Sequence, residues 1–449
     1  MNKWFFAALF VLLAGCTVNV DYSISDTDGR SKLVELSVYD GDNNSLGNAS
    51  VFVEQISQDF FYNVGDYWDD NSPDEAGTNL YNVYLDWSWK DLEPGDGNFD
   101  WDYLNTLGFQ DAFSAEQVMV RLGVMSTSAW IYNTGGAKES AGFPDWVDAD
   151  NNSLIMDKYL EFVTALVNHF NDLSFSPDFY MVEVELNALG QHSNMTNNES
   201  IAWLGRLVNA IKSANPDAVV AVDVAAQNLS PFMDEGREKN SILVNEDLYP
   251  LSVPDWLGKI NSINYDIISY RMQPFGWMSN GNWTDAVNSV EMLCNFNRSV
   301  YISWAGFLSE APVLPEGAAD FEYYPVNYSE EWQLNNSLNL MDYLLGNPCV
   351  IGVYWDYYDF VEHGIGGNNS NSVRLTSGFT TGYRNDNGDV VNGVKKLVFN
   401  PMKELWDEQF VNTVLVTGEN GSVSFYGFLG EYKIILSKGL IWRTLFIKV

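Results

Sequence analysis

Short apolar segments alternate with helix-like segments between residues 58 and 406, and this alternation constrains the fold more than any other feature. We expect strands over Phe60–Val64, Leu80–Trp87, Val118–Val124, Phe179–Glu185, Ala218–Val224, Ile263–Tyr270, Ser299–Trp304 and Cys349–Trp355. Apolar residues recur every three or four positions in most of the intervening segments, as in 157–170 and 201–211. Eight strands with helical crossovers predict an α/β fold, a (β/α)8 TIM barrel. An open doubly wound sheet is the alternative, but no Gly-rich phosphate loop follows an early strand.

The segments on either side of the barrel have a different pattern. Residues 33–57 alternate apolar and polar side chains around a Gly- and Asn-rich turn, which predicts a β-hairpin. Short strands separated by Gly-rich turns recur after residue 410, so we expect a small β module that pairs with this hairpin. The predicted parts are a signal peptide (1–16), a polar tether (17–32), the hairpin (33–57), the barrel (58–410) and the C-terminal β module (411–449).

The first sixteen residues carry the signals for a cellular compartment. Lys3 precedes an apolar run of about ten residues, which is short for a membrane span. The run ends in Leu13-Ala14-Gly15-Cys16, which resembles the signal peptide of a lipoprotein, and the resemblance implies lipidation of Cys16. We therefore expect an exported protein that is anchored by lipid at the cell envelope or cell surface. Export permits a disulfide bond between Cys294 and Cys349, with two buried thiols as the alternative.

Composition excludes some partners and favours others. The formal charge is −37, with 23 basic and 60 acidic residues, so phosphate backbones would be repelled and nucleic acid is not expected as a partner. Aromatic residues make up 15% of the chain. Their faces suit the C–H patches of sugar rings, although aromatic residues also fill large cores. Three scattered His residues do not predict a zinc site, and we expect no metal, no cofactor and a monomer.

The fourth predicted strand ends in an unusual cluster of polar residues. In a strand, residues two apart share a face, so Glu183, Glu185 and Asn187 would point the same way. Two carboxylates on one face of a buried strand are costly unless they are paired or used in chemistry. A structural ion network is one explanation, and a carboxylate site at the end of a barrel strand is the other.

Several segments resemble the clan of retaining (β/α)8 glycoside hydrolases that includes family 10 xylanases. The segment Trp89 to Trp101 matches W-x-x-x-E-P-x-x-G-x-F-x-(F/W), a stretch that follows strand 2 in the clan. Residues 118–131 and 143–147 look like its strand 3 and the Pro-Trp segment beyond it. The histidine motif of family 10 on strand 3 is absent. The resemblance implies a polysaccharide substrate and retaining hydrolysis of a β-linked glycan.

Retaining hydrolysis needs two carboxyl groups about 5 Å apart, an acid/base and a nucleophile. In the clan these are a Glu of an Asn-Glu pair that ends strand 4 and a Glu that ends strand 7. Here strand 4 continues as Glu185-Leu186-Asn187, and strand 7 reads VYISWAGF without a Glu. The resemblance implies Glu185 or Glu183 as acid/base, with Glu310, in the loop after strand 7, or Asp266, near strand 6, completing the pair.

Other side chains near the strand ends are predicted to bind substrate. They are Trp87, Trp89, Asn187, His192, Tyr270, Trp304 and Trp355. The alternative function is a catalytically inactive lipoprotein whose barrel binds glycans through the aromatic residues of this set, Trp87, Trp89, Tyr270, Trp304 and Trp355. A third alternative is a surface-layer or solute-binding lipoprotein that uses the barrel only as a scaffold, because one fold supports many functions.

Overall fold

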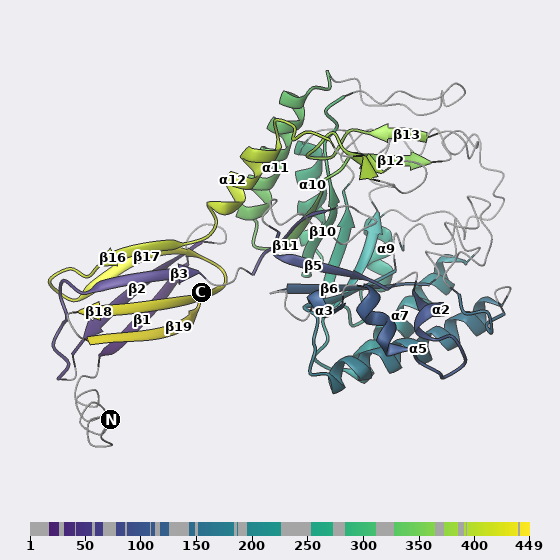
Figure 1. Cartoon of the computed structure of the whole chain (residues 1–449), viewed down its shortest axis with the longest axis horizontal. Coiled ribbons are helices and arrows are strands. Elements are labelled where there is room, and N and C mark those ends of the chain that lie inside the picture. Colours follow the sequence, from purple (N-terminus) through teal and green to yellow (C-terminus); the bar gives the residue numbers. More distant parts are fainter. Residues whose placement is uncertain are drawn as a thin grey trace, which may run out of the picture. The chain divides into compact units, whose positions relative to one another are not determined.

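The structure is a computed structural model of the whole chain, which forms two compact units (Figure 1). It describes residues 18–26, 31–40, 42–55, 59–65, 78–85, 88–107, 109–112, 117–124, 143–148, 151–183, 186, 195–225, 253–272, 283–310, 327–363, 372–384, 390–391, 393–438 and 441–449. One unit contains the central part of the chain, and the other contains segments from both of its ends.

The central unit is built on an eight-stranded sheet. Its strands are β4 (Phe61–Gly65), β5 (Leu80–Tyr84), β6 (Gln117–Leu122), β7 (Phe179–Val182), β8 (Val220–Ala225), β9 (Ile267–Arg271), β10 (Ser299–Ala305) and β11 (Val350–Asp356). They are ordered β4-β11-β10-β9-β8-β7-β6-β5, and every hydrogen-bonded pair is parallel. All eight predicted strands are therefore confirmed, with shifts of a few residues at their ends.

The two edge strands of this sheet meet and nearly close the barrel. The Asn79 N–H donates to the Tyr62 carbonyl at 3.0 Å, and the Tyr62 N–H donates to Asn79 Oδ1 at 2.7 Å. The amide of Asn63 also donates to the Leu80 carbonyl at 2.9 Å. The side-chain amides of Asn79 and Asn63 thus take the place of backbone groups between β4 and β5. The predicted (β/α)8 barrel is confirmed, and the open doubly wound sheet is not what forms.

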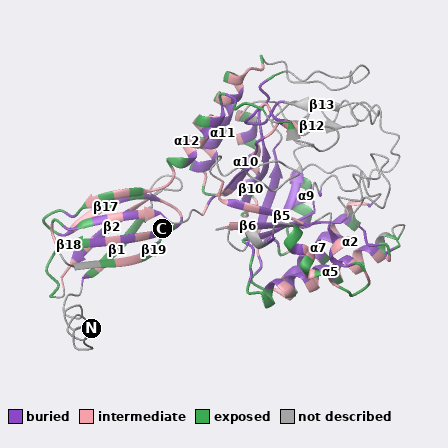
Figure 2. Ribbon diagram, viewed as in Figure 1, coloured by how far each residue is buried: buried purple, intermediate pink, exposed green. Residues whose placement is uncertain are grey.

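Helices separate most of the barrel strands. They are α2 (Trp89–Leu92), η2 (Trp101–Leu107, a 3-10 helix), α3 (Phe109–Ala112), α5 (Asn152–Asp172), α7 (Asn197–Ala214), α9 (Val253–Ile260), α10 (Trp283–Cys294), α11 (Glu330–Gly346) and α12 (Phe399–Asp407). Thr196 and Glu199 form a capping box that begins α7. Figure 2 shows the barrel strands as buried and α5 with exposed residues, as expected for amphipathic helices outside a barrel.

Shorter elements follow β11. The strands β12 (Phe360–His363) and β13 (Ser372–Leu375) form one antiparallel pair, and β14 (Tyr383–Arg384) and β15 (Val390–Val391) form another. A disulfide bond joins Cys294, at the end of α10, to Cys349, just before β11, with their Cα atoms 5.9 Å apart. The pairing that the sequence left open is thus formed in this structure.

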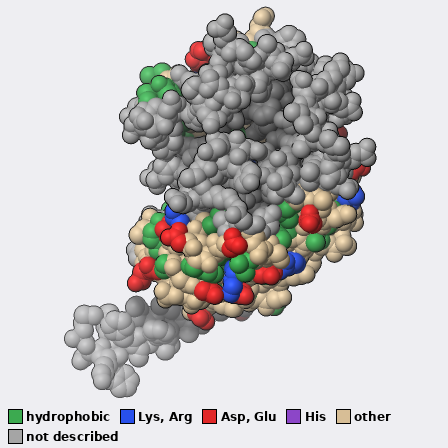
Figure 3. All heavy atoms as spheres, turned by 90° about the vertical axis from the view of Figure 1, so that its right-hand side faces the viewer, with side chains coloured by type: hydrophobic (Ala, Val, Ile, Leu, Met, Phe, Trp, Pro, Cys, Tyr) green, Lys and Arg blue, Asp and Glu red, His purple; other side chains and the backbone are tan. Residues whose placement is uncertain are grey.

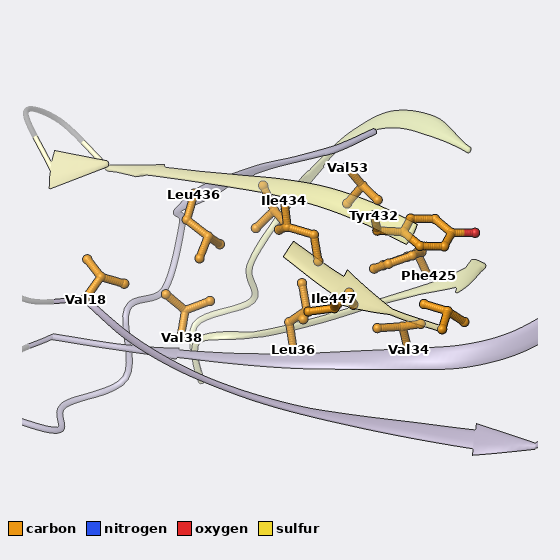
Figure 4. Packing of buried hydrophobic residues seen from close by; sticks show 12 residues of the cluster. Val18, Val34, Leu36, Val38, Val53, Phe425, Tyr432, Ile434, Leu436 and Ile447 are labelled. Carbon is orange, nitrogen blue, oxygen red and sulfur yellow. The ribbon is translucent and has the colours of Figure 1, made fainter. Parts of the chain in front are cut away.

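The second unit is a sandwich of two antiparallel sheets. One sheet contains β1 (Asn19–Asp26), β2 (Ser31–Tyr39) and β17 (Ser422–Phe428), in that order. The other has the order β16 (Asn412–Val416), β3 (Ser50–Gln55), β18 (Glu431–Lys438) and β19 (Ile441–Lys448). Figure 4 shows Val34, Leu36 and Val38 of β2 facing Tyr432, Ile434 and Leu436 of β18, and all six are buried. The predicted β module of N-terminal and C-terminal strands is confirmed.

Two predictions about its N-terminal part are wrong. The predicted tether contains β1, which pairs with β2 from Asn19↔Tyr39 to Asp26↔Lys32. The predicted hairpin starts with a bridge between Tyr39 and Ser45, but β2 and β3 then join different sheets. The reason is burial: a two-stranded hairpin would leave its apolar face open, whereas facing sheets cover both apolar faces.

Exposed ion pairs lie on the outer helices of the barrel unit. Lys158 on α5 pairs with Asp96 at 3.1 Å and with Glu161 at 2.9 Å, and Arg206 on α7 pairs with Asp157. Figure 3 shows acidic and basic side chains interspersed on the described part of one face. Solvent screens such pairs, so they contribute little to the stability of the barrel.

One His residue of α5 makes stability depend on pH. His169 stacks on Trp101, with ring centroids 4.7 Å apart, and burial lowers its pKa. The unfolded chain then binds a proton more tightly than the folded chain, so stability is lost as the pH falls through the unfolded value of about 6.5. The variant His169→Phe keeps an aromatic ring at this position but cannot bind a proton. When the pH is lowered from 8 to 5.5, we expect the free energy of unfolding of wild type to fall relative to that of His169→Phe. Urea midpoints of both proteins at both pH values test this, and a constant difference would contradict it.

Candidate functional site

The barrel interior has an apolar layer to which every strand contributes. Its residues pack in one cluster: Phe61, Leu80, Met119, Phe179, Met181, Ala221, Ile267, Tyr301 and Tyr354. Side chains two residues apart on a strand share a face, so the next inward position on each strand lies closer to its carboxyl end. That end of a (β/α)8 barrel is where active sites are built.

The next inward positions are polar on seven of the eight strands. We call these residues the polar layer: Asn63, Asn82, Arg121, Asp223, Ser269, Ser303 and Asp356. All seven side chains are buried. Removing so many polar groups from water is unfavourable unless each is paired or used, so this layer marks the carboxyl end of the barrel as the candidate site.

Asp223 on β8 is the centre of a hydrogen-bond network in this layer. Its Oδ1 accepts hydrogen bonds from the hydroxyls of Ser269, at 2.6 Å, and Ser303, at 2.7 Å. Its Oδ2 accepts a hydrogen bond from Arg271 Nε at 2.9 Å. Burial lowers the pKa of Arg271 to about 9, so the guanidinium stays charged at neutral pH. Three neighbouring strands are thus held together by one buried ion pair and two hydroxyls.

A second network joins the ends of β10 and β11. Trp304 Nε1 donates to Asp356 Oδ2 at 2.7 Å, and the hydroxyl of Ser377 donates to the same oxygen at 2.8 Å. The guanidinium carbon of Arg271 lies 5.9 Å from the centroid of the Trp304 ring. The predicted site residue Trp304 therefore does lie beside charged groups at the carboxyl end of the barrel.

The opposite side of the layer carries a second cation. The guanidinium carbon of Arg121 on β6 lies 4.0 Å from the ring centroid of Tyr84 on β5, a cation–π contact. Burial raises the pKa of the Tyr301 hydroxyl. Within the described residues, neither that hydroxyl nor Asn82 Oδ1 has a hydrogen-bond partner. Buried polar atoms of this kind are usually satisfied by a ligand or by water.

The fourth barrel strand is the exception to the polar layer. β7 ends at Val182, and Glu183 adopts a left-handed backbone conformation with φ +53°. Its carboxylate accepts hydrogen bonds from Trp203 Nε1 on α7, at 2.9 Å, and from the Val124 N–H, at 3.1 Å. The side chain is 0% exposed. The prediction that Glu183 continues the strand is therefore wrong, because the chain leaves the strand conformation there and Glu183 bonds to Trp203 on α7. Its role as acid/base stays a prediction.

The segment that resembles the clan folds into a structural cluster instead of a sugar site. Trp89 is 1% exposed, and its indole donates to Glu93 Oε2 at 2.8 Å. The other carboxylate oxygen of Glu93 accepts from the Gly97 N–H, while burial raises the pKa of this group. Trp146, from the predicted Pro-Trp segment, donates to the Glu93 carbonyl at 2.9 Å. Trp89 thus stabilises the loop after β5, and its ring is not exposed for the predicted stacking on a sugar.

Two other predicted sugar-binding aromatics point out of the barrel. Tyr270 and Trp355 are 1% and 0% exposed, and each alternates with inward residues of its strand. The hydroxyl of Tyr270 bonds to Ser289 on α10, and the ring of Trp355 packs against Phe379. Both predictions are wrong, because Tyr270 packs toward α10 and Trp355 packs against Phe379, away from the barrel interior.

The carboxylates proposed to complete the catalytic pair have different positions. Asp266 precedes β9 and accepts hydrogen bonds from Lys212 Nζ, at 2.6 Å, and from the Val220 N–H, at 2.8 Å, at the amino ends of the strands. It lies at the wrong end of the barrel. Glu310 is exposed beyond β10, and its N–H donates to Thr376 Oγ1 at 2.9 Å. Glu310 remains a candidate.

The remaining predicted residues lie outside the described residues. They are Cys16, Trp87, Glu185, Asn187 and His192. Their assigned roles stay predictions.

The sequence does hold a signal for the residues of these networks. Arg121, Asp223 and Arg271 are each the single charged residue of a mostly apolar strand: QVMVRL, VAVDVA and IISYR. A charge in such a segment must face a partner in the barrel interior, since it cannot face the apolar helix layer. Such charged residues lie within the strands and not in the loops that follow them.

The described part of the chain holds no group of three or more His, Cys, Asp or Glu residues placed to bind a metal ion. Within the same residues, no helix combines the length and the apolar character that a membrane span needs.

The strand order places the chain in the class of (β/α)8 barrels. No protein-family model and no curated protein matches the sequence. Similar solved structures are glycoside hydrolases. Xylanase 10B from Thermotoga petrophila has 11% identity and a TM-score of 0.45, over 78% of this chain and 95% of that chain. An exo-β-1,4-mannosidase from Opitutaceae bacterium strain TAV5 has 14% identity and a TM-score of 0.48, over 86% and 62%. The GH53 catalytic domain of Ignisphaera aggregans has 13% identity and a TM-score of 0.42, over 72% and 92%. At these values the likeness concerns the fold alone.

Proposed function

We propose that this chain is a cell-surface glycoside hydrolase that binds polysaccharide at the carboxyl ends of its barrel strands and hydrolyses β-linked O-glycosyl bonds with retention. The main support for this location of the site is the polar layer. A core needs no buried Asp223–Arg271 pair and no Asp356–Trp304 bond for packing, and replacing buried ion pairs with apolar residues is often stabilising. Such groups are typical of a site that must orient a polar ligand.

Glu185 is the proposed proton donor. Glu183 is occupied by structural hydrogen bonds, and this leaves Glu185 as the remaining carboxylate of the strand 4 segment. A general acid at this place would protonate the leaving glycosidic oxygen. Glu310, whose backbone is bonded to Thr376, is the proposed nucleophile. Trp304 would contact the sugar beside Asp356.

One observation favours a second candidate function, glycan binding without hydrolysis. In the clan of retaining enzymes that the sequence resembles, the nucleophile ends the seventh barrel strand. The seventh barrel strand of this chain is β10, and its last residues are Ser303, Trp304 and Ala305. A hydroxyl and an indole can bind a sugar, but they cannot form the covalent glycosyl ester through a carboxylate. Hydrolysis therefore depends on Glu310, five positions beyond the strand, approaching the substrate.

One experiment separates the two candidates. The full chain is incubated with xylan, mannan, galactan and mixed-linkage β-glucan, and reducing ends and bound polymer are both measured. Release of reducing ends from one polymer supports hydrolysis. Binding without release supports the second candidate, and neither binding nor release would refute both.

The proposed location at the cell surface rests on the resemblance of residues 1–16 to a lipoprotein signal peptide. A lipid anchor would hold the barrel where polymers too large for import are met. Metabolic labelling with a fatty-acid analogue tests it: Cys16→Ser should abolish the label, and a Cys16→Ser protein that keeps the label would refute the anchor.

A further inference from the structure

The outer face of the sheet β1-β2-β17 is hollowed. A depression of about 400 Å³ lies over the three strands, and the side chains on its floor are Asp21, Ser23, Glu35, Ser37, Ser422 and Ser424. In β2 these positions alternate with Val34, Leu36 and Val38, which point into the sandwich core. The depression is therefore on the face of the sheet that points away from that core.

The floor is a regular grid of hydrogen-bonding groups. Asp21, Ser37 and Ser422 are direct neighbours across the three strands, and Ser23, Glu35 and Ser424 form the next row. Neighbouring strands are about 4.8 Å apart, and residues two apart on one strand are separated by about 6.7 Å. Among the described residues, none of these six side chains bonds to another residue, so their hydroxyls and carboxylates all face outward.

The chemistry of this floor excludes several ligands. Two carboxylates and no Lys, Arg or His line the depression, so phosphate, sulfate and uronate groups would be repelled. An apolar partner would leave the grid without hydrogen bonds. A peptide that extends a sheet binds along its edge strand, and this site lies on the face. An uncharged polyol fits, because its hydroxyls can donate to Asp21 and Glu35 and can both donate to and accept from Ser.

An exposed ring lies at one end of the grid. Tyr426 is 66% exposed, and it follows Ser424 by two residues on the same face, beside Leu33. Its ring can stack on the C–H face of a sugar. From Ser422 to Tyr426 the strand covers about 13 Å, which is long enough for more than one sugar unit of a chain. From this geometry we infer that the outer face of β1-β2-β17 binds a neutral polysaccharide chain.

This site is separate from the polar layer of the barrel and would work even if the barrel were inert. With an active barrel, it would keep the polymer bound to the protein between cleavage events. It therefore goes beyond the proposed function and does not depend on it.

The test is affinity electrophoresis of the full chain in native gels that contain xylan, mannan, galactan or mixed-linkage β-glucan. Glu35→Gln and Tyr426→Ala are compared with Phe446→Ala, which removes an equally exposed ring (67%) from β19 in the other sheet. A hydrogen bond to a charged group contributes enough for about a tenfold loss of affinity. We expect the double variant Glu35→Gln/Tyr426→Ala to bind the preferred neutral polymer at least about ten times more weakly, with Phe446→Ala unchanged.

Three outcomes would overturn the inference. They are equal retardation of the double variant and wild type, no retardation of wild type by any of the neutral polymers, and stronger retardation by dextran sulfate than by every neutral polymer. Release of reducing ends from short oligosaccharides is measured on the same variants. That activity reports on the barrel alone. Loss of the surface site would therefore change retardation by the polymer, whereas failure of the proposed hydrolysis would abolish release from short oligosaccharides.

Discussion

Replacing Glu185 with Gln is expected to lower the rate of reducing-sugar release by about 10²–10⁴-fold, the usual contribution of general acid–base catalysis. The amide keeps the size and polarity of the side chain but cannot deliver a proton to the leaving oxygen. Binding of the polymer should persist, because the charged groups of the polar layer are unchanged. Initial rates on the best polymer of the panel, together with binding to it, provide the measurement.

The chain supplies a matched control two residues away. Glu183→Gln keeps an acceptor oxygen for Trp203 Nε1 and the Val124 N–H, so this variant should fold and retain activity within a few-fold of wild type. If Glu183→Gln loses activity to the same extent as Glu185→Gln, the assignment of Glu183 as structural is wrong. If Glu185→Gln releases sugar at the wild-type rate, Glu185 is not the acid.

Arg271→Met is expected to lower the free energy of unfolding by about 3–5 kcal/mol, the typical cost of removing one partner from a buried ion pair. The side chains of Arg271 and Asp223 are 5% and 0% exposed, and Arg271 Nε lies 2.9 Å from Asp223 Oδ2. Met fills similar space, so the loss reports mainly on the carboxylate of Asp223 left without its cation. Urea unfolding followed by tryptophan fluorescence measures the difference.

Arg206→Met is the matched control for this experiment. Arg206 also pairs with an aspartate, Asp157, but the two side chains are 44% and 54% exposed. Solvent screens this pair, and we expect its loss to leave the urea midpoint nearly unchanged. A cost of Arg271→Met no larger than that of Arg206→Met would mean that the Asp223 network does not stabilise the barrel.

The strands of the barrel could be predicted because burial selects apolar segments whatever the details of their contacts. Which way each side chain points could not be predicted so well. The sequence predicts that Tyr270 contacts substrate, but Ser269 and Arg271 face the barrel interior and Tyr270 therefore faces α10. A shift of one residue in a strand reverses every side chain, and the apolar pattern of β9 does not determine that register.

The misplacement of Glu183 has a different physical cause. The alternation of residues predicts which face of the sheet a side chain lies on only while the backbone remains extended. The backbone turns at Glu183, with φ +53°. Nothing in the segment FYMVEVEL marks this turn, because it is set by contacts with Trp203 and Val124 that are distant in sequence. The same holds for the sandwich, in which β2 and β3 pair with C-terminal strands instead of with each other.

The sandwich also determines the order in which the protein can fold. β3 pairs with β18, and Lys433 contacts Glu54 at a sequence separation of 379. Contacts this distant in sequence form slowly, because a long loop must close before any of them stabilises the product. The sandwich cannot be completed before β18 is synthesised, whereas the barrel strands are all contiguous in the central segment. Until the C-terminal strands are synthesised, one edge of β2 and both edges of β3 stay unpaired, so this part of the chain would be the one most exposed to aggregation during synthesis.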